Sequence, residues 1–450
     1  MAGGVWLSQN KVRPGAYINF KSVPRPTMTV GDRGIVAVPL TLHWGEEDAL
    51  TEVLSSDLLD GASRKAVGFT AFDEESKLLS AALSYAYKAL VFRMNTGGER
   101  ASAEIGSLVC TARHTGTFGN RLVVTVDEED GAYTVITYAD GETVDTQKVT
   151  QISELEDNDY IIFSKKDGEA ETPDFTPTET AGTPLTGGTD GEAAESRAFP
   201  KFLSALQSAR YQTMCCFSSD KSVKKNVQSF IKGQRDDEGR YVQGVLADYD
   251  GADCEGIISV ANGVVVDGVS FSKEDAVAIA AGMTAGANFN QSNTAREVSG
   301  ATSVIGEMTD AEIRAALQKG KFLFSTSTSG KVKVEQDINS LHTFTKAKDY
   351  NFSKNRVIRT LDEIGTTTVQ TWEDSYMGKV DNNDTGRGLF KADLVAYGGE
   401  LQRLSGIQEF GGSDDIEIAQ GNDLDAVLVT WAVKPVDSME KLYLTCNIRS

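Results

Sequence analysis

The sequence has few of the residues that carry chemistry. Among its 450 residues there are five cysteines and three histidines. The cysteines contain no Cys-x-x-Cys pair, and no histidine is spaced to complete a zinc site with them. They are Cys110, Cys215, Cys216, Cys254 and Cys446. The composition therefore argues against a disulfide framework and a structural zinc site, and it fits reduced thiols in a cytoplasm.

Long hydrophobic runs and an excess of positive charge are also missing. No apolar run reaches the ~18 residues of a membrane-spanning helix, and the first residues, MAGGVWLSQNKVRPG, lack the apolar core of a signal peptide. Lys and Arg total 44 against 65 Asp and Glu, a net charge of −21. This balance argues against a nucleic-acid groove or an anionic membrane as the main partner.

Motifs of enzymes are absent as well. His43, His114 and His342 lie in no nucleophile motif such as Gly-x-Ser-x-Gly, and no phosphate-binding or dinucleotide-binding glycine motif occurs. Gly330-Lys331 lacks the upstream glycine of a phosphate loop, so we interpret it as a hairpin turn. The sequence predicts no catalytic residue and no cofactor.

Two acidic segments deserve a comparison with metal sites. Residues 381–386, DNNDTG, resemble the start of a calcium loop, but Ala392 stands where the bidentate glutamate is required. We interpret 381–386 as a turn between helices. Residues 127–130, DEED, are typical of a solvated hairpin tip. No metal site is predicted.

What the sequence does have is an acidic module. Residues 121–200 hold 19 acids and 5 bases, which is −14 of the total −21. Within them 121–126, 132–138 and 142–149 are β-branched and aromatic runs, separated by turns that end in Asp-Gly. We predict a small antiparallel β domain, followed by a polar linker or exposed loop over 164–196.

The flanks of this module alternate between helical patterns and short apolar strands. Taken together, they predict one α/β domain formed by 31–97 and 197–348, with the β module of 98–196 inserted into it. Helices are expected at 46–57, 73–90, 199–210 and 221–234 and after the N-terminal signals at Ser272 and Thr309; strands are expected at 89–94, 241–249, 257–269, 321–327 and 331–336.

The C-terminal part, 349–435, predicts two long helices and a strand at 426–434. A final segment, 436–450, contains a second strand at 441–448 whose apolar and polar side chains alternate, as in a half-buried strand. Termini normally fray, so such a strand needs a partner to hold it.

The N-terminal 1–30 differ in charge, because Lys11, Arg13, Lys21 and Arg25 precede the first acidic residue, Asp32. Between Pro14 and Pro24 lies a short alternating strand, AYINF. It is consistent with an edge strand of the chain's own domain or with an arm that adds a strand to a neighbouring subunit.

Three segments carry a resemblance to a known family. Arg13, Pro14, Gly15, Tyr17 and Phe20 form an Arg-Pro-Gly-x-Tyr-x-x-Phe pattern that resembles the N-terminus of contractile phage tail sheath proteins of the Gram-positive type. Residues 113–120, RHTGTFGN, resemble the turn at which the family's inserted domain begins, with His-Thr in place of the more usual Tyr-Pro. Residues 440–448 resemble its C-terminal arm.

The resemblance implies an inner α/β (α+β) region that contains both termini, an outward-facing inserted domain, and a non-enzymatic role. Such subunits polymerise as stacked rings around a tail tube and contract to drive it through a cell envelope. The implied interface arms, which exchange strands between subunits, are Ala16, Tyr17, Ile18, Asn19 and Phe20, and Leu442, Tyr443, Leu444, Thr445, Cys446, Asn447 and Ile448.

The implied partners are other copies of the chain, the tail tube protein, the baseplate and the tail terminator. Lys379, Arg387 and Lys391 surround the turn between the two C-terminal helices, where they fit either a contact with an acidic tube or a solvated turn. The implied location is a virion tail or a phage-tail-like particle, assembled in the bacterial host cytoplasm and released by lysis.

Two alternatives stay open at this point. The first is the sheath of another contractile injection system. The second is a cytosolic hydrolase with an inserted β domain, against which the missing nucleophile and base argue.

Overall fold

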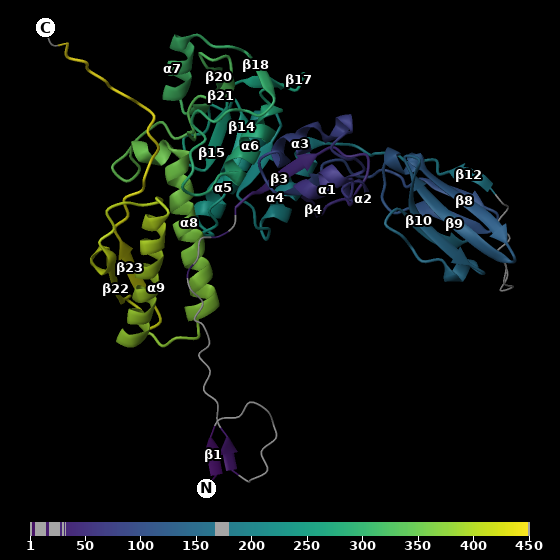
Figure 1. Ribbon diagram of the computed structural model, residues 1–450, viewed down its shortest axis with the longest axis horizontal. Helices are drawn as coiled ribbons and strands as arrows, with labels where there is room; N and C mark the ends of the chain where they lie inside the picture. The colour runs from purple at the N-terminus through teal and green to yellow at the C-terminus, as the bar shows by residue number, and fades with distance from the viewer. Residues whose placement is uncertain are drawn as a thin grey trace. The chain divides into compact units, whose positions relative to one another are not determined.

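The computed structural model (Figure 1) describes residues 2–4, 15–17, 28, 31, 33–166 and 180–448. The chain divides into two compact units. The larger contains Gly31–Thr366, Leu404–Gln408 and Pro435–Ser450, and the smaller contains Met1–Val30, Thr367–Arg403 and Glu409–Lys434.

A seven-stranded sheet forms the centre of the larger unit. In spatial order its strands are β19 (Lys321–Phe322), β15 (Ile257–Val260), β14 (Gln243–Ala247), β13 (Thr213–Cys216), β3 (Ile35–Leu40), β5 (Lys88–Arg93) and β4 (Leu50–Leu54). Neighbours are parallel except for β4, which runs antiparallel to β5. Strands from both sides of the acidic module therefore share one sheet.

Helices cover both faces of this sheet, because each central strand is apolar on both sides. Cys215 belongs to the core that also contains α3 (Lys77–Leu83) and α6 (Ala276–Gly286). Its neighbour Cys216 belongs to the opposite core, with α4 (Glu195–Leu206) and α5 (Lys221–Asp236). The predicted mixed α/β fold is confirmed, and the adjacent cysteines fill two separate cores.

Two local predictions for this domain are wrong. Residues 46–57 were expected to be one helix, but they contain β4 and only the beginning of α1 (Ser55–Asp60). Pairing with β5 buries Val53 in the core, and that gain outweighs the weak helical spacing. The helix expected over 73–90 is limited to a 3₁₀ turn, Glu74–Ser76, and α3.

The inserted segment is a β-sandwich. One sheet has the order β10-β9-β8-β12 and the other β11-β7-β6. Their bounds are β6 (Ser102–Ile105), β7 (Leu108–Ala112), β8 (Leu122–Glu129), β9 (Ala132–Ala139), β10 (Glu142–Val149), β11 (Ile161–Lys165) and β12 (Thr180–Pro184). The predicted hairpins are confirmed. The linker prediction is wrong at 180–184, which pair with β8 and complete the first sheet.

The sandwich is joined to the domain of the seven-stranded sheet around Trp44, which is completely buried. Its ring centroid lies 5.0 Å from that of His114 and 5.2 Å from that of Phe118. The backbone also approaches closely here, since a Cβ atom on Gly116 would lie 2.0 Å from the carbonyl oxygen of His43. The glycine in the 113–120 segment thus has a packing reason, in addition to its φ of 131°.

Smaller elements complete the larger unit. These are α2 (Arg64–Val67), the sheet of β17 (Val269–Phe271), β16 (Gly263–Val266) and β18 (Ala301–Ile305), the hairpin of β20 (Phe324–Thr326) and β21 (Val332–Val334), and α7 (Asp310–Gln318). The Gly330-Lys331 segment lies in the β20–β21 turn, as predicted.

The smaller unit contains the end of the first predicted C-terminal helix and the whole of the second. Helix α8 (Asn355–Thr371) begins in the larger unit and is followed by one π turn, Trp372–Tyr376, and then by α9 (Asp384–Arg403). The hairpin of β22 (Ile416–Gln420) and β23 (Val427–Trp431) confirms the strand expected at 426–434. Ile416 is buried, and the Trp431 ring centroid lies 6.3 Å from that of Tyr397 on α9. Strands β1 (Ala2–Gly4) and β2 (Gly15–Tyr17) form a separate parallel pair.

Candidate assembly surfaces

The C-terminal segment is extended and exposed (Figure 1). Residues 441–448 form no strand within the described part of the chain. Leu442 is 86% exposed and Ile448 is 97% exposed. The prediction of a half-buried strand is therefore wrong for the single subunit, because nothing in the described chain pairs with this segment. An alternating apolar pattern without a local partner is what an interaction segment requires.

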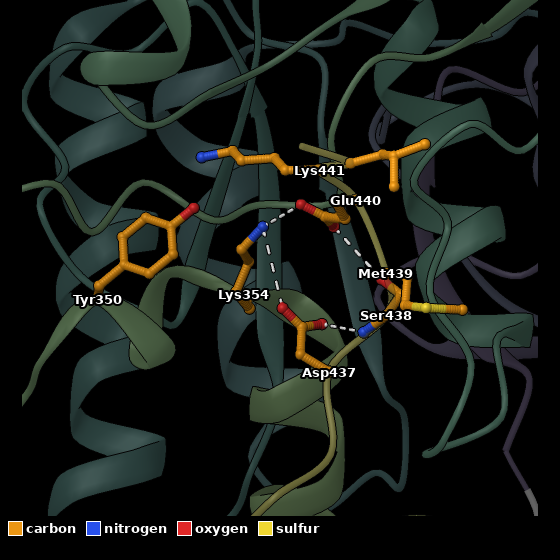
Figure 2. Close-up of a pocket in the computed structure, with 8 residues that line it drawn as sticks. Tyr350, Lys354, Asp437, Ser438, Met439, Glu440 and Lys441 are labelled. Atoms are coloured by element: carbon orange, nitrogen blue, oxygen red, sulfur yellow. Dashed lines mark hydrogen bonds and ion pairs between the residues drawn. The ribbon is translucent and has the colours of Figure 1, made fainter. Parts of the chain in front are cut away.

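The root of this segment, in contrast, is firmly bound. Figure 2 shows the Lys354 ammonium between the carboxylates of Glu440 and Asp437, with Tyr350 beside it. Lys354 Nζ forms an ion pair with Glu440 and lies 4.0 Å from an Asp437 oxygen. Together with Ser438, Met439, Lys441 and Leu442 these residues line an open pocket of about 460 Å³.

Further donors surround the Glu440 carboxylate. Gln336 Nε2 donates to Oε2 at 2.7 Å, and Thr294 Oγ1 donates to Oε1 at 2.7 Å. The exposed fractions of the Lys354 and Glu440 side chains are only 4% and 10%. The carboxylate is thus removed from water but fully supplied with donors.

The pKa values in this pair reflect the competition between burial and pairing. Burial alone would raise the pKa of Glu440, but the bonds from Lys354, Gln336 and Thr294 hold it below its usual value. Burial would lower the pKa of Lys354, and the contact with Glu440 raises it instead. Both groups are therefore charged at neutral pH, and the pair holds the segment to the subunit.

The predicted N-terminal arm is described only in part. Ala16 and Tyr17 lie in β2, whereas Ile18, Asn19 and Phe20 lie outside the described residues. Just before the described stretch 33–166, the Gly31 backbone N–H donates to Glu363 Oε1 of α8 at 2.8 Å.

The β22–β23 hairpin offers edges that could receive a strand. Its two strands pair only with each other within the described residues, so one edge of each strand is left without a ladder partner. A two-stranded sheet is marginally stable on its own and gains from a third strand. Leu428 on β23 is also 60% exposed.

Of the three basic residues of the possible tube contact, Lys379 lies in the turn before α9, whereas Arg387 and Lys391 lie inside α9 near its start. They are not equally available. Arg387 Nη1 donates to Asn382 Oδ1 at 2.8 Å, and Nη2 lies 2.5 Å from Asp384 Oδ1. The Arg387 side chain is only 13% exposed. Lys379 donates to the Asp374 carbonyl at 2.5 Å, and Lys391 is half-buried.

One arrangement looks superficially like a catalytic triad. His43 Nδ1 lies 2.8 Å from Asp190 Oδ2 and 3.4 Å from Thr117 Oγ1. A catalytic relay needs the nucleophile and the carboxylate on different ring nitrogens. Here both approach Nδ1, and Thr117 donates directly to Asp190, so the group ties the insertion to the flanking domain.

Other chemistry is not favoured by the described residues. No group of three or more His, Cys, Asp or Glu side chains among them is arranged to hold a metal ion. In the same part of the chain, no helix is long and apolar enough to cross a membrane.

Sequence reasoning missed Lys354 and Glu363 as residues that bind the terminal segments. Lys354 directly precedes α8 and Glu363 lies in its middle, and their partners are 86 and 332 residues away. No local signal could have identified them. Glu440 was quoted in the C-terminal segment, but without a role.

Comparison with known proteins agrees with this organisation. Three family models match successive parts of the chain: the phage tail sheath protein beta-sandwich domain at 96–190, the phage tail sheath protein central domain at 187–340 and the phage tail sheath C-terminal domain at 347–449. The chain belongs to the phage tail sheath family. The insertion, central sheet and C-terminal segment of this sheath protein thus each have a counterpart in the family.

Individual relatives support the same assignment. The sheath protein is 34% identical to the XkdK protein of the phage-like element PBSX of Bacillus subtilis, with all of both chains covered. It is 38% identical to a sheath tail protein of Desulfitobacterium hafniense of known structure, with a TM-score of 0.80 and coverage of 96% and 99% of the two chains. A sheath tail protein of Listeria innocua is 32% identical, with a TM-score of 0.81 and coverage of 91% and 93%.

The fold also extends to a distant sheath. The contracted helical sheath of the anti-feeding prophage is 9% identical, with a TM-score of 0.59 and coverage of 96% and 98%. The sheath protein is therefore a structural component of a phage tail or tail-like particle and functions in a sheath polymer. The comparisons give the hydrolase alternative no support.

Proposed function

We propose that this sheath protein polymerises as stacked rings around a tail tube and shortens to drive the tube through a cell envelope, without enzymatic activity. In this proposal the terminal arms link neighbouring subunits. The observation that carries it is the C-terminal segment, which is bound up to Glu440 and exposed over 441–448. A segment with Leu442, Leu444 and Ile448 on one face has apolar surface to bury against another copy.

The β22–β23 hairpin is the receiving site that the described chain supports best. Each strand has five residues, and the arm has enough length to pair with all of them. About four or five ladder bonds at roughly 0.5–1.5 kcal/mol each make one exchanged strand a weak contact, which becomes strong when it is repeated throughout a polymer. Such links also permit rings to move without separating.

The division into parts follows from this proposal. Residues 1–30 and 436–450 are arms, 31–97 with 197–348 and then 349–435 form the inner region, and 98–196 is the outward-facing insertion. The partners are other copies, the tube protein, the baseplate and the tail terminator. Assembly takes place in the host cytoplasm, with release by lysis.

The native thiols provide a direct test of the arm. Cys446 is exposed on the arm, whereas Cys110, Cys215 and Cys216 are buried. Burial raises the pKa of Cys110 and of Cys216 to about 12, so these thiols resist alkylation at neutral pH. In isolated subunits Cys446 should react rapidly with a maleimide, and in sheath polymers its rate should fall at least about tenfold.

A Cys446→Ser variant identifies the fast thiol, and a chain without residues 1–20 and 436–450 tests the arms themselves. Folded truncated subunits should fail to form striated tubes in electron micrographs. Normal tubes from this chain, or an unchanged Cys446 rate in polymers, would contradict strand exchange.

For the tube contact we propose Lys379, Arg387 and Lys391. Since Arg387 is occupied by Asp384 and Asn382, reversal of its charge tests the turn as well as the tube. The Lys391→Glu variant is therefore the cleaner test, with Lys225→Glu, at an exposed position of α5, as a control. Sheathed tubes of normal length from Lys391→Glu would exclude Lys391 from the contact.

A further inference from the structure

We propose that Glu440 is the fixed pivot of the C-terminal arm and that the first half of α8 connects the roots of both arms. The proposal rests on the strand exchange described above. It assigns a positioning role to Glu440 and Lys354, and it places the boundary between the bound and the donated parts of the chain at residues 440 and 441.

The contacts of Glu440 define this boundary. Its two carboxylate oxygens accept bonds from three separate segments: Lys354 just before α8, Gln336 after β21, and Thr294 before β18. Because the donors come from three different segments, a movement of one segment leaves the carboxylate bound to the other two. The next described residues, 441–448, are all exposed.

A second layer of bonds connects these donors to α8. Thr294 Oγ1 also accepts from the Asp337 backbone N–H at 2.9 Å. The Asp337 carboxylate pairs with Arg359 of α8 at 2.5 Å, and both side chains are almost completely buried. Asn355 Nδ2 donates to the same carboxylate at 3.0 Å. The pivot is thus joined to α8 through Lys354 directly and through Asp337 indirectly.

The N-terminal arm is attached one turn further along the same helix. Glu363, four residues after Arg359, accepts the Gly31 N–H at the point where the arm leaves the larger unit. Glu363 lies nine positions after Lys354, and this spacing corresponds to about 14 Å along the helix axis. A pull on one arm is therefore passed to the other through this short rigid segment.

Charge inversion tests the pivot, because a double variant can restore the ion pair that the single variant removes. In Glu440→Lys the introduced ammonium faces Lys354, and the root should detach. In the double variant Lys354→Glu with Glu440→Lys the charges are opposite again, and the root should reattach at least in part. Glu297→Gln, which alters an exposed lysine–glutamate pair of the same unit, serves as the matched control.

Hydrogen exchange of the folded full-length subunit measures attachment before any assembly. In the wild type, amides of 436–440 should exchange at least about tenfold more slowly than those of 441–448, as expected where Val436 N–H donates to the Gly406 carbonyl. Glu440→Lys should abolish this difference, and the double variant should restore part of it. Equal exchange of the two segments in the wild type, or unchanged exchange in Glu440→Lys, would overturn the pivot.

Electron microscopy then separates the pivot from the arm mechanism. We expect Glu440→Lys to form at least about tenfold fewer sheath tubes, with recovery in the double variant and normal yield from Glu297→Gln. If the chain without its arms still gives tubes, the strand-exchange mechanism is wrong, and hydrogen exchange alone decides the pivot. If truncation abolishes tubes but Glu440→Lys assembles normally, the arm mechanism stands and the pivot is overturned.

Discussion

Arg235 on α5 and Asp362 on α8 form a two-pronged ion pair. Nη2 lies 2.6 Å from Oδ1 and Nη1 lies 3.0 Å from Oδ2. The two side chains are 10% and 5% exposed. Burial disfavours the charged guanidinium, yet Asp362 more than offsets this and raises the pKa of Arg235. Asp362 thereby holds α8 to α5 within the larger unit.

Removal of the Asp362 charge should destabilise the fold strongly. Asp362→Asn leaves the Arg235 guanidinium buried without its partner, and such losses cost about 3–5 kcal/mol. Denaturant unfolding of purified subunits measures this change. Glu297→Gln, in an exposed pair, should change the free energy of unfolding by less than about 1 kcal/mol. Equal effects of the two substitutions would contradict the account.

His114 should make the stability of the subunit depend on pH. Burial, and then the charges of nearby arginines, lower the pKa of His114 to about 4 from an ordinary value of 6.5. Between these values the unfolded chain binds a proton that the folded chain does not bind, so stability falls as the pH decreases from about 6.5 toward 4. Above pH 6.5 this residue should have no such effect.

Comparison with His114→Gln isolates the contribution from the carboxylates that also titrate in this range. The difference in melting temperature between the wild type and the variant should change with pH between about 6.5 and 4, with the wild type losing more. Parallel curves over this interval would show that His114 does not titrate as described.

Gly116 should not tolerate a side chain. A Cβ atom there would lie 2.0 Å from the His43 carbonyl oxygen, and φ is 131°. We expect Gly116→Ala to lower the free energy of unfolding by at least about 2 kcal/mol. Gly233 lies inside α5, and a Cβ atom there would meet its nearest neighbour, an Asp237 oxygen, only at 3.9 Å. Gly233→Ala should therefore stabilise the fold by about 0.5–1 kcal/mol. Denaturant unfolding distinguishes the two signs.

The N-terminus of α7 depends on a capping box. Thr309 Oγ1 accepts from the Glu312 backbone N–H, and the Glu312 carboxylate accepts from the Thr309 backbone N–H at 2.8 Å. None of the α7 residues is buried, so the cap is a major part of its stability. Thr309→Ala should cost about 1 kcal/mol and speed hydrogen exchange within α7. Glu312→Gln keeps an acceptor and should have a smaller effect.

The sequence predicted elements best where local chemistry and packing agree. The Asp-Gly turns identified the hairpins of the insertion, because positive φ values at Asp130 and Gly131 are needed there. The Thr309 capping box located the start of α7, because its two side chains accept from backbone N–H groups at the helix N-terminus. Prediction failed at 46–57, where Val53 joins a strand for the sake of long-range pairing with β5.

The C-terminal segment shows the same limit in another form. Alternation in 441–448 predicts a strand that needs a partner, but the described part of the single subunit supplies none. The exposure of Leu442 and Ile448 became visible only in three dimensions. The anchor of the segment was equally hidden, because Lys354 and Glu440 meet across 86 residues.

By itself, the sequence determined the mixed α/β composition, the acidic inserted β module, the absence of known catalytic motifs and the family to which the chain is similar. These properties depend on residue types and short spacings. Only the tertiary structure decided that Lys354 pairs with Glu440 and that Glu363 of α8 accepts a bond from Gly31. It also placed Cys215 and Cys216 in different cores. Such relationships arise from long-range packing, in which a buried charge takes whichever partner the fold brings within reach.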